Sequence, residues 1–111
     1  MEEEYYDVED FWKFDLKVGH VIDAERLPRT RKLIRLEVDF GKERRTIVAG
    51  IGDQFTPDML IGKKYVFVLN IKPRKFAGVE SKGMILAAED EKGKLYLITA
   101  EGDAPSGSKV Y

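Results

Sequence analysis

Hydrophobic and polar residues alternate along much of the chain, and the clearest run covers residues 34–40. Hydrophobic side chains fill every second position there, from Ile34 to Phe40, and charged side chains fill the others. A period of two residues is that of a β-strand with one buried face. The pattern therefore predicts a half-buried antiparallel strand over 34–40.

An earlier alternating run, Leu16–Ala24, predicts a second strand. Its pattern places Val18 and Ala24 on one face and Val21 on the opposite face, with Gly19 as the site of a β-bulge. Runs of β-branched and aromatic residues predict four more strands. These are Arg45–Ile51, which follows a hairpin turn at Gly41–Glu43, then Tyr65–Ile71, and a last hairpin of Met84–Ala88 and Leu95–Thr99.

Two short helical segments are also predicted. Thr56 followed by Pro57 suits a helix start, because proline is favoured at the first helical position, so one helical turn is expected at 56–60. Asp7–Phe14 has a capping residue, acids in its first turn and hydrophobic residues at helical spacing. A helix this short is unstable alone, so it must pack on the barrel or on a partner chain.

Short strands at regular spacing, with one brief helix between the third and fourth long strands, predict an all-β fold. We expect a five-stranded OB-fold barrel, with an SH3-like barrel or a small sandwich as the alternatives. The 111 residues suit one domain. We expect an acidic segment and short helix at 1–13 and the OB-fold domain at 14–111, whose turn-rich end, 102–111, is a C-terminal extension with a short strand.

The composition argues against enzyme chemistry. The chain has no cysteine and a single histidine, His20, which falls inside a predicted strand. A catalytic triad needs three convergent groups, and metal sites are built mainly from Cys and His or from carboxylates at defined spacing. Neither pattern is present, and no glycine-rich phosphate loop occurs. We therefore expect a non-enzyme without a cofactor.

The N-terminal sequence MEEEYY is acidic, whereas a signal peptide begins with basic and then hydrophobic residues. No hydrophobic run approaches the roughly 18 residues of a membrane span. We expect a cytoplasmic protein without a membrane contact. Charged residues make up 35% of the chain, with only one Asn and one Gln, a composition typical of thermophile proteins.

Charge is unevenly distributed along the chain. The net charge is −1, but residues 1–10 hold six of the 20 acids and no base. The remaining chain has 19 bases and 14 acids, a net charge of +5. Two stretches concentrate the bases: residues 26–45 hold eight bases and three acids, and residues 63–82 hold six bases and one acid. This separation into an acidic tail and a basic body favours an anionic partner.

The stretch Asn70–Met84 is the strongest candidate site. Four cations lie in it beside a single acid, Glu80, and Pro and Gly residues set its path. Cations bind phosphates, and apolar groups such as Phe76 and Met84 can pack against unstacked RNA bases. RNA is the predicted ligand; the alternatives are a solvated surface loop and, for Phe76 and Met84, burial in the core. The four cations are Lys72, Arg74, Lys75 and Lys82.

Several segments together resemble the tRNA-binding domain family, the OB-fold module of methionyl-tRNA synthetases and of free structure-specific tRNA-binding proteins. The resemblance covers nearly the whole chain, and the segments occur in the family's order. They are Phe14–Val21, Lys32–Leu33, Val38–Gly41, Ile47–Ile51, Gly62–Lys64, Asn70–Pro73 and Ser81–Ala88.

The resemblance implies a function and a set of binding residues. The domain would bind the outer corner of tRNA by shape and charge, without reading the anticodon, and assist methionyl-tRNA synthetase as an archaeal-type beta subunit. It would form a homodimer through its terminal segments. The family motifs add Lys32, Asn70, Ser81 and Met84 to the four cations as tRNA-binding residues.

The chain departs from the family in one loop. Many members have a His-Pro-x-Ala-Asp-x-Leu run before the second strand, whereas Leu27–Leu33 lacks its His and Asp and contributes Arg29 and Arg31 instead. A chaperone-like or scaffolding dimer of the same fold is the alternative function, since a secretion-chaperone branch shares the fold.

Overall fold

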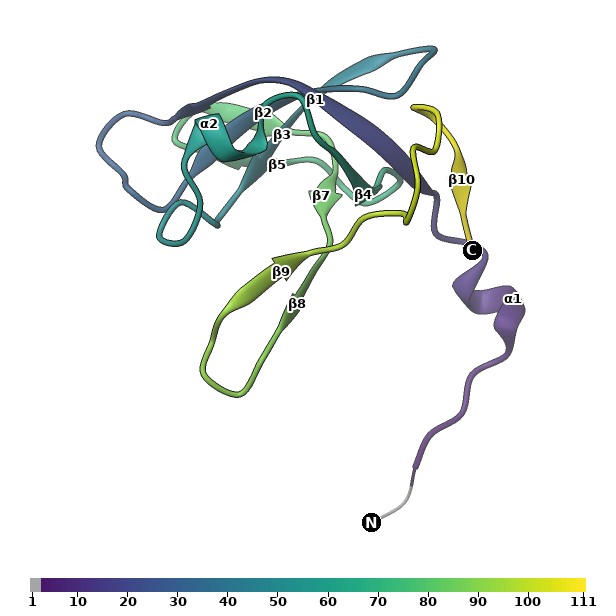
Figure 1. Ribbon diagram of the computed structural model, residues 1–111. Coiled ribbons are helices and arrows are strands. Elements are labelled where there is room, and N and C mark those ends of the chain that lie inside the picture. The colour runs from purple at the N-terminus through teal and green to yellow at the C-terminus, as the bar shows by residue number, and fades with distance from the viewer. Residues whose placement is uncertain (1–2) are drawn as a thin grey trace.

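The computed structural model describes residues 3–111; Met1 and Glu2, the start of the predicted acidic segment, lie outside the described residues. A curved sheet dominates the molecule (Figure 1). Its strands run in the order β3-β2-β1-β4-β7, and β10 pairs with β1. They are β1 (Leu16–Arg26), β2 (Ile34–Asp39), β3 (Arg44–Ala49), β4 (Lys64–Val68), β7 (Met84–Ile85) and β10 (Lys109–Val110).

The sheet curls until its two edges approach, which makes the OB-type barrel that the sequence predicts. Strand β1 is long enough to pair antiparallel with β2, β4 and β10. On the far side, the Lys82 N–H donates to the Thr46 carbonyl at 2.9 Å and the Val48 N–H donates to Ser81 Oγ at 2.9 Å. These bonds join β3 to the segment just before β7 and nearly close the barrel.

The barrel core follows the alternation of β2, whose hydrophobic residues from Ile34 to Val38 are all buried. Val21 lies in the same core at 0% exposure, which corrects the face predicted for it. The register of β1 against β2 shifts between Val21 and Asp23, so the bulge lies there and not at Gly19. The extra residue of a bulge reverses which of the neighbouring side chains point inward. The sequence pattern does not reveal this reversal, because Val21 and Ile22 are both hydrophobic.

Both predicted helices are present, and they differ in their packing. Helix α2 (Pro57–Leu60) lies between β3 and β4, as predicted, and fully buries Leu60 against the core. Helix α1 (Val8–Phe11) is shorter than the predicted 7–14 and buries none of its residues. It lies outside the barrel, and the N-terminal arm continues beyond it (Figure 1). Within the described residues, no helix is long and apolar enough to cross a membrane.

The basic stretch is a hairpin, where the sequence predicted a loop. Strands β5 (Arg74–Phe76) and β6 (Val79–Ser81) pair antiparallel. They are joined by Ala77 and Gly78, which have φ values of 49° and 83°. Two consecutive residues with positive φ make a tight hairpin turn, which suits the twist of the strands. The alternation of short β5 is obscured by its cations, so the pattern gave no strand signal.

The last predicted hairpin is also modified. The strand expected at Met84–Ala88 breaks at Leu86 into β7 and β8 (Ala87–Glu89), and β8 pairs with β9 (Leu95–Leu97). The β8–β9 hairpin projects from the barrel (Figure 1). Gln54 attaches its tip, because its amide donates to the Gly93 carbonyl at 2.8 Å and accepts from the Leu95 N–H at 2.9 Å.

The packing of Gly52 generates a prediction about stability. A Cβ on Gly52 would lie 2.1 Å from the Arg31 carbonyl oxygen, whereas a Cβ on Gly50 would lie 3.7 Å from its nearest neighbour, the flexible Lys32 side chain. We expect Gly52→Ala to lower the free energy of unfolding by about 2 kcal/mol, a typical overpacking cost. Gly50→Ala is the matched control and should change it by less than about 1 kcal/mol. Equal urea midpoints for the two variants would contradict this assignment.

Candidate nucleic-acid interface

A shallow hollow on the basic hairpin, residues 70–84, brings several predicted site residues together. Lys72, Arg74, Ser81 and Met84 line it, with Phe76 beside them. Its volume of about 70 Å³ is well below the roughly 300 Å³ of the smallest usual small-molecule pockets. The hollow therefore suits contact with a surface such as a nucleic-acid backbone.

Apolar groups of the hollow remain accessible. Met84 is 46% exposed, so it lies at the rim and not in the core. Phe76 is half-buried, and the Arg74 guanidinium lies 4.9 Å from the centre of its ring. An arginine stacked on an aromatic ring presents a flat cationic surface, on which an RNA base can stack.

Ser81 is placed to support the hairpin from below. Its side chain is 3% exposed. Its hydroxyl accepts from the Val48 N–H at 2.9 Å and donates to the Gly83 carbonyl at 3.1 Å. Both hydrogen bonds are internal, so Ser81 shapes the floor of the hollow and fixes the hairpin to β3.

Arg45, which the sequence analysis did not select, holds both ends of the hairpin. Its guanidinium donates to the Leu69 carbonyl at 2.7 Å and to the Lys82 carbonyl at 3.1 Å. It also pairs with Glu43, and this hydrogen bond lowers the pKa of the Glu43 carboxyl. Leu69 and Lys82 are 24 and 37 residues from Arg45 in the sequence, so no local pattern could have identified the role of Arg45.

The Asn70 side chain is also engaged within the protein. Its Oδ1 accepts from the Asp15 N–H at 2.6 Å, and its Nδ2 donates to the Lys13 carbonyl at 2.7 Å. The Leu69 N–H adds a bond of 2.8 Å to the Asp15 carbonyl. Asn70 therefore connects the start of the basic hairpin to the segment that follows α1.

The other predicted cations occupy two separate places. Lys75 is exposed on β5, and Lys82 is 58% exposed, with its Nζ 3.9 Å from Glu80. Lys32 lies apart from them in a different hollow, lined also by the carboxylates of Asp53 and Glu89. The structure thus brings seven of the eight predicted residues to one hairpin and leaves Lys32 on the β1–β2 loop.

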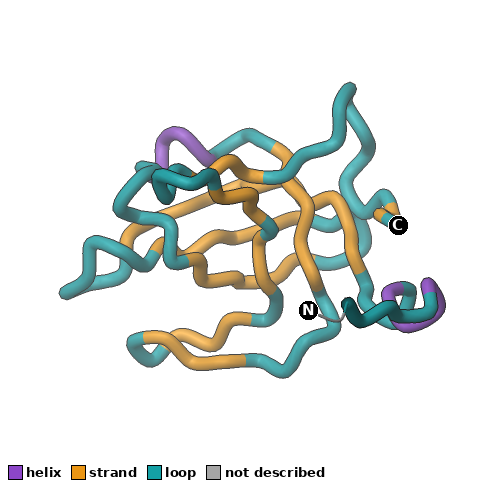
Figure 2. Tube along the Cα trace, turned by 90° about the horizontal axis from the view of Figure 1, so that it is seen from below, coloured by secondary structure: helices purple, strands orange, loops and turns teal. Residues whose placement is uncertain are grey.

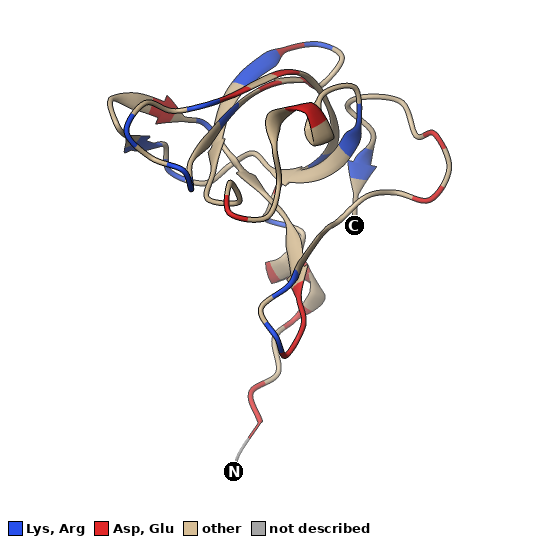
Figure 3. Cartoon of the chain, turned by 60° about the vertical axis from the view of Figure 1, so that its left-hand side comes forward, with Lys and Arg blue, Asp and Glu red and all other residues tan. Residues whose placement is uncertain are grey.

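The charge separation seen in the sequence persists in space. Acidic residues occupy the N-terminal arm, and basic segments gather on the barrel (Figure 3). Some cations of the barrel bind groups of the protein itself. Arg35 lies within 4 Å of three carboxylates. Arg26 donates to the backbone carbonyls of Arg31 and Gly52. Within residues 3–111, the ion pairs do not involve Lys72, Arg74 or Lys75.

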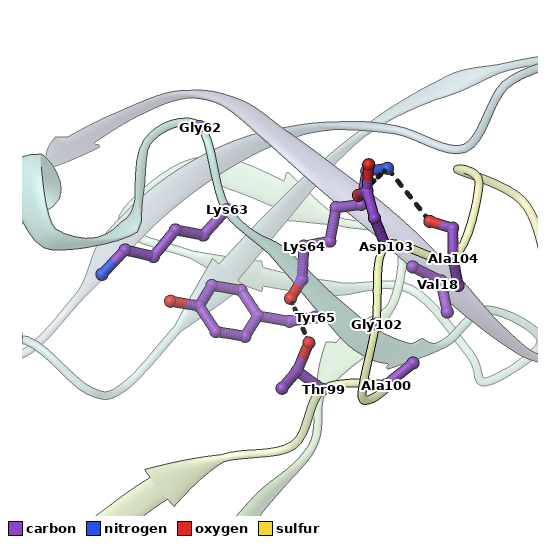
Figure 4. A pocket seen from close by; sticks show the side chains of 10 residues that line it. All are labelled: Val18, Gly62, Lys63, Lys64, Tyr65, Thr99, Ala100, Gly102, Asp103 and Ala104. Carbon is purple, nitrogen blue, oxygen red and sulfur yellow. Dashed lines mark hydrogen bonds and ion pairs between the residues drawn. The ribbon is translucent and has the colours of Figure 1, made fainter.

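A larger open hollow lies elsewhere, between β4 and the C-terminal segment (Figure 4). Its volume is about 380 Å³. Lys64 in its wall is already neutralised, since its Nζ lies 2.8 Å from Asp103 and donates to the Ala104 carbonyl at 3.0 Å. The same contact lowers the pKa of Asp103. Size alone therefore does not select the site; the hairpin hollow differs in having two exposed cations, Lys72 and Arg74, beside the apolar Phe76 and Met84.

The described residues 3–111 contain no cluster of three or more His, Cys, Asp or Glu side chains that could hold a metal ion. His20 lies on β1 opposite Asp39 of β2 and Lys64 of β4. The geometry thus offers a cationic binding surface, with stacking groups beside it, as the candidate site.

Comparison with known proteins agrees with this geometry. The tRNA binding domain family model matches residues 16–109. Methionine–tRNA ligase of Methanocaldococcus jannaschii is 48% identical over 107 residues, which cover 96% of this chain and 16% of the ligase. The chain thus spans about a sixth of the length of the curated relatives it matches.

Solved structures match this chain over nearly its whole length and over the whole length of the matched chains. A MetRS related protein from Pyrococcus horikoshii is 57% identical with a TM-score of 0.94, and the match covers 98% of this chain and all of that one. The chaperone CsaA of Bacillus anthracis is 34% identical with a TM-score of 0.87, over 97% of this chain and all of its own. The matched module is a non-catalytic binding domain. The chain belongs to the tRNA binding domain family.

Proposed function

We propose that this domain binds tRNA through the basic hairpin and thereby assists an aminoacyl-tRNA synthetase, the methionyl enzyme. Binding is tolerant of sequence and specific for shape, and it engages the outer corner of the folded tRNA. A domain that assists a synthetase in this way would act in the cytoplasm. Similarity to methionine–tRNA ligases and to a MetRS related protein supports the choice of enzyme.

The observation that carries this proposal is the composition of the hairpin surface. Lys72 and Arg74 are exposed and outside the ion pairs of residues 3–111, and they adjoin the half-buried Phe76 and the exposed Met84. Cations supply the salt-dependent attraction for phosphates, and the apolar groups supply stacking surface for bases. The fixed backbone of the hairpin supplies the shape.

A salt titration of tRNA binding tests the proposal. We expect Lys72→Glu with Lys75→Glu to weaken binding and to reduce the slope of log K against log salt by about 1.5, the loss of two phosphate contacts. The matched control is Lys42→Glu with Lys63→Glu, which makes the same charge change at two exposed lysines outside the hairpin. Unchanged tRNA affinity of the hairpin variant at low salt would contradict the proposal.

We also propose that two copies associate through their terminal segments. Helix α1 and the C-terminus lie side by side in two views (Figure 1, Figure 2). Large hydrophobic side chains are exposed there, including Phe11 at 47%, Trp12 at 53% and Tyr111 at 78%. A helix with no buried residue gains stability only from packing against a further surface, which a second copy would provide.

Sedimentation equilibrium tests the dimer. We expect a dimer at micromolar concentration, and a monomer for Phe11→Ser with Trp12→Ser, because burial of each such side chain contributes about 2 kcal/mol. Tyr96→Ser is the control, since Tyr96 is 48% exposed on the β8–β9 hairpin. A monomeric unsubstituted protein, or a variant that remains dimeric, would overturn this part of the proposal.

A chaperone-like activity is the second candidate, and two observations favour it. The chaperone CsaA has the same fold over its whole chain at 34% identity. The exposed aromatic side chains of the arm could also contact an unfolded client. Binding to an unfolded protein together with no tRNA binding would favour this function over the first.

A further inference from the structure

The N-terminal arm, residues 3–10, combines two chemical features of single-stranded RNA. It carries five carboxylates, and two exposed aromatic side chains, Tyr5 at 85% and Tyr6 at 77%, lie among them. Carboxylates are anionic as phosphates are, and aromatic rings stack as bases do. Within residues 3–111, the ion pairs include one acid of the arm, Asp10, which lies 3.0 Å from Lys13, and not the other four. Those four are Glu3, Glu4, Asp7 and Glu9.

A cationic hollow lies at the start of the basic hairpin, and its volume is about 260 Å³. Arg44 and Lys82 in its wall are exposed. Within residues 3–111, the ion pairs do not include Arg44, and the Lys82 Nζ lies 3.9 Å from Glu80. The acid in the wall, Glu43, is paired with Arg45. The hollow therefore attracts an anionic group.

The apolar part of this hollow faces the proposed tRNA site. Leu69, Ile71 and Pro73 complete its wall, which gives an aromatic ring a surface to pack on. Ile71 also lines the smaller hollow that contains Lys72 and Arg74. An anionic segment bound here would thus lie beside the cations of the hairpin, and its carboxylates would repel phosphates from them.

The root of the arm is fixed next to this hollow. Leu69, in the wall, donates its N–H to the Asp15 carbonyl at 2.8 Å, and the Asn70 side chain bonds to the backbone of both Lys13 and Asp15. From Asp15 back to Asp7, the path contains α1, about 6 Å long, and four further residues that span up to about 13 Å. The acids before α1 can therefore reach the hollow.

We propose that the N-terminal arm is an internal competitor of tRNA, which folds back into the hollow of Arg44 and Lys82 and which tRNA displaces. This is a second position of the arm, since Figure 3 shows the arm directed away from the barrel. The inference rests on the proposed tRNA-binding function and adds a regulation of the same surface.

The tether makes a weak contact sufficient. A short flexible connection gives the arm an effective concentration in the millimolar range at the hollow. A folded tRNA, which offers many phosphates at once, displaces the arm, whereas a short RNA that makes few contacts does not. The arm therefore raises the selectivity of the surface for large, folded RNA.

Removal of charge from the arm tests the competition. We expect Glu3→Gln, Glu4→Gln and Asp7→Asn together to raise tRNA affinity about fivefold at 0.1 M salt, as for an arm that occupies the hollow in about four of five molecules. The matched control Glu89→Gln, Glu91→Gln and Glu101→Gln neutralises three exposed acids outside the arm. Its effect should stay below about twofold, because salt screens charges beyond about 10 Å. An equal rise in both variants would overturn the inference, because the effect would then follow net charge and not position.

A nitroxide label detects the contact without RNA. The chain has no cysteine, so Glu3→Cys provides a single labelling site on the arm. We expect the label to broaden the amide NMR signals of Arg44, Leu69 and Lys82 at low salt and much less at 1 M salt, where charges are screened beyond about 3 Å. Signals of residues 28–32, beyond the other end of the 11-residue strand β1, are the control and should stay sharp.

The two measurements separate this inference from the function on which it rests. If the unsubstituted protein binds tRNA and the three amide signals show no salt-dependent broadening, the inference about the arm alone is refuted. If the signals broaden but the unsubstituted protein does not bind tRNA, the proposed function fails, while the folding back of the arm is confirmed.

Discussion

The hydrogen bonds of Arg45 are the constraint on which the proposed binding surface depends. One guanidinium holds the Leu69 and Lys82 carbonyls, so the two ends of the basic hairpin are anchored to β3 by the same side chain. Ser81 adds a buried bond to the same strand. Hydrogen bonds from a charged donor contribute about 1.5–3 kcal/mol each. The cations of the hairpin therefore stand on a rigid support and not on a mobile loop.

The distribution of charge explains how a chain with a net charge of −1 can carry the proposed RNA-binding surface. The acids of the N-terminal segment are carried on an arm away from the barrel (Figure 3). On the barrel, cations divide into two kinds. Arg26, Arg35 and Arg45 hold backbone or carboxylate groups of the protein itself. Cations outside such contacts, such as Lys72, are left for a ligand.

The sequence was sufficient to predict an element correctly where one local pattern dominated. The alternation of β2 is strict because one face is buried, and Pro57 marks the start of α2, so both were predicted correctly. The face of Val21 was wrong because a bulge changes the phase between two hydrophobic residues. The roles of Ser81 and Asn70 depend on partners 33 to 57 residues away, which only the folded chain brings near. Dimer formation and a thermophile origin stay predictions.

A charge-preserving change at Arg45 tests most directly whether the fixed hairpin, and not charge alone, creates the tRNA-binding surface. Lysine keeps the cation but cannot hold both carbonyls in the same way, so Arg45→Lys should loosen the hairpin. The account predicts faster amide exchange in residues 70–84 and about tenfold weaker tRNA binding, the loss of about one charged hydrogen bond, with an unchanged salt slope. Wild-type tRNA affinity in Arg45→Lys, despite faster exchange in the hairpin, would contradict it.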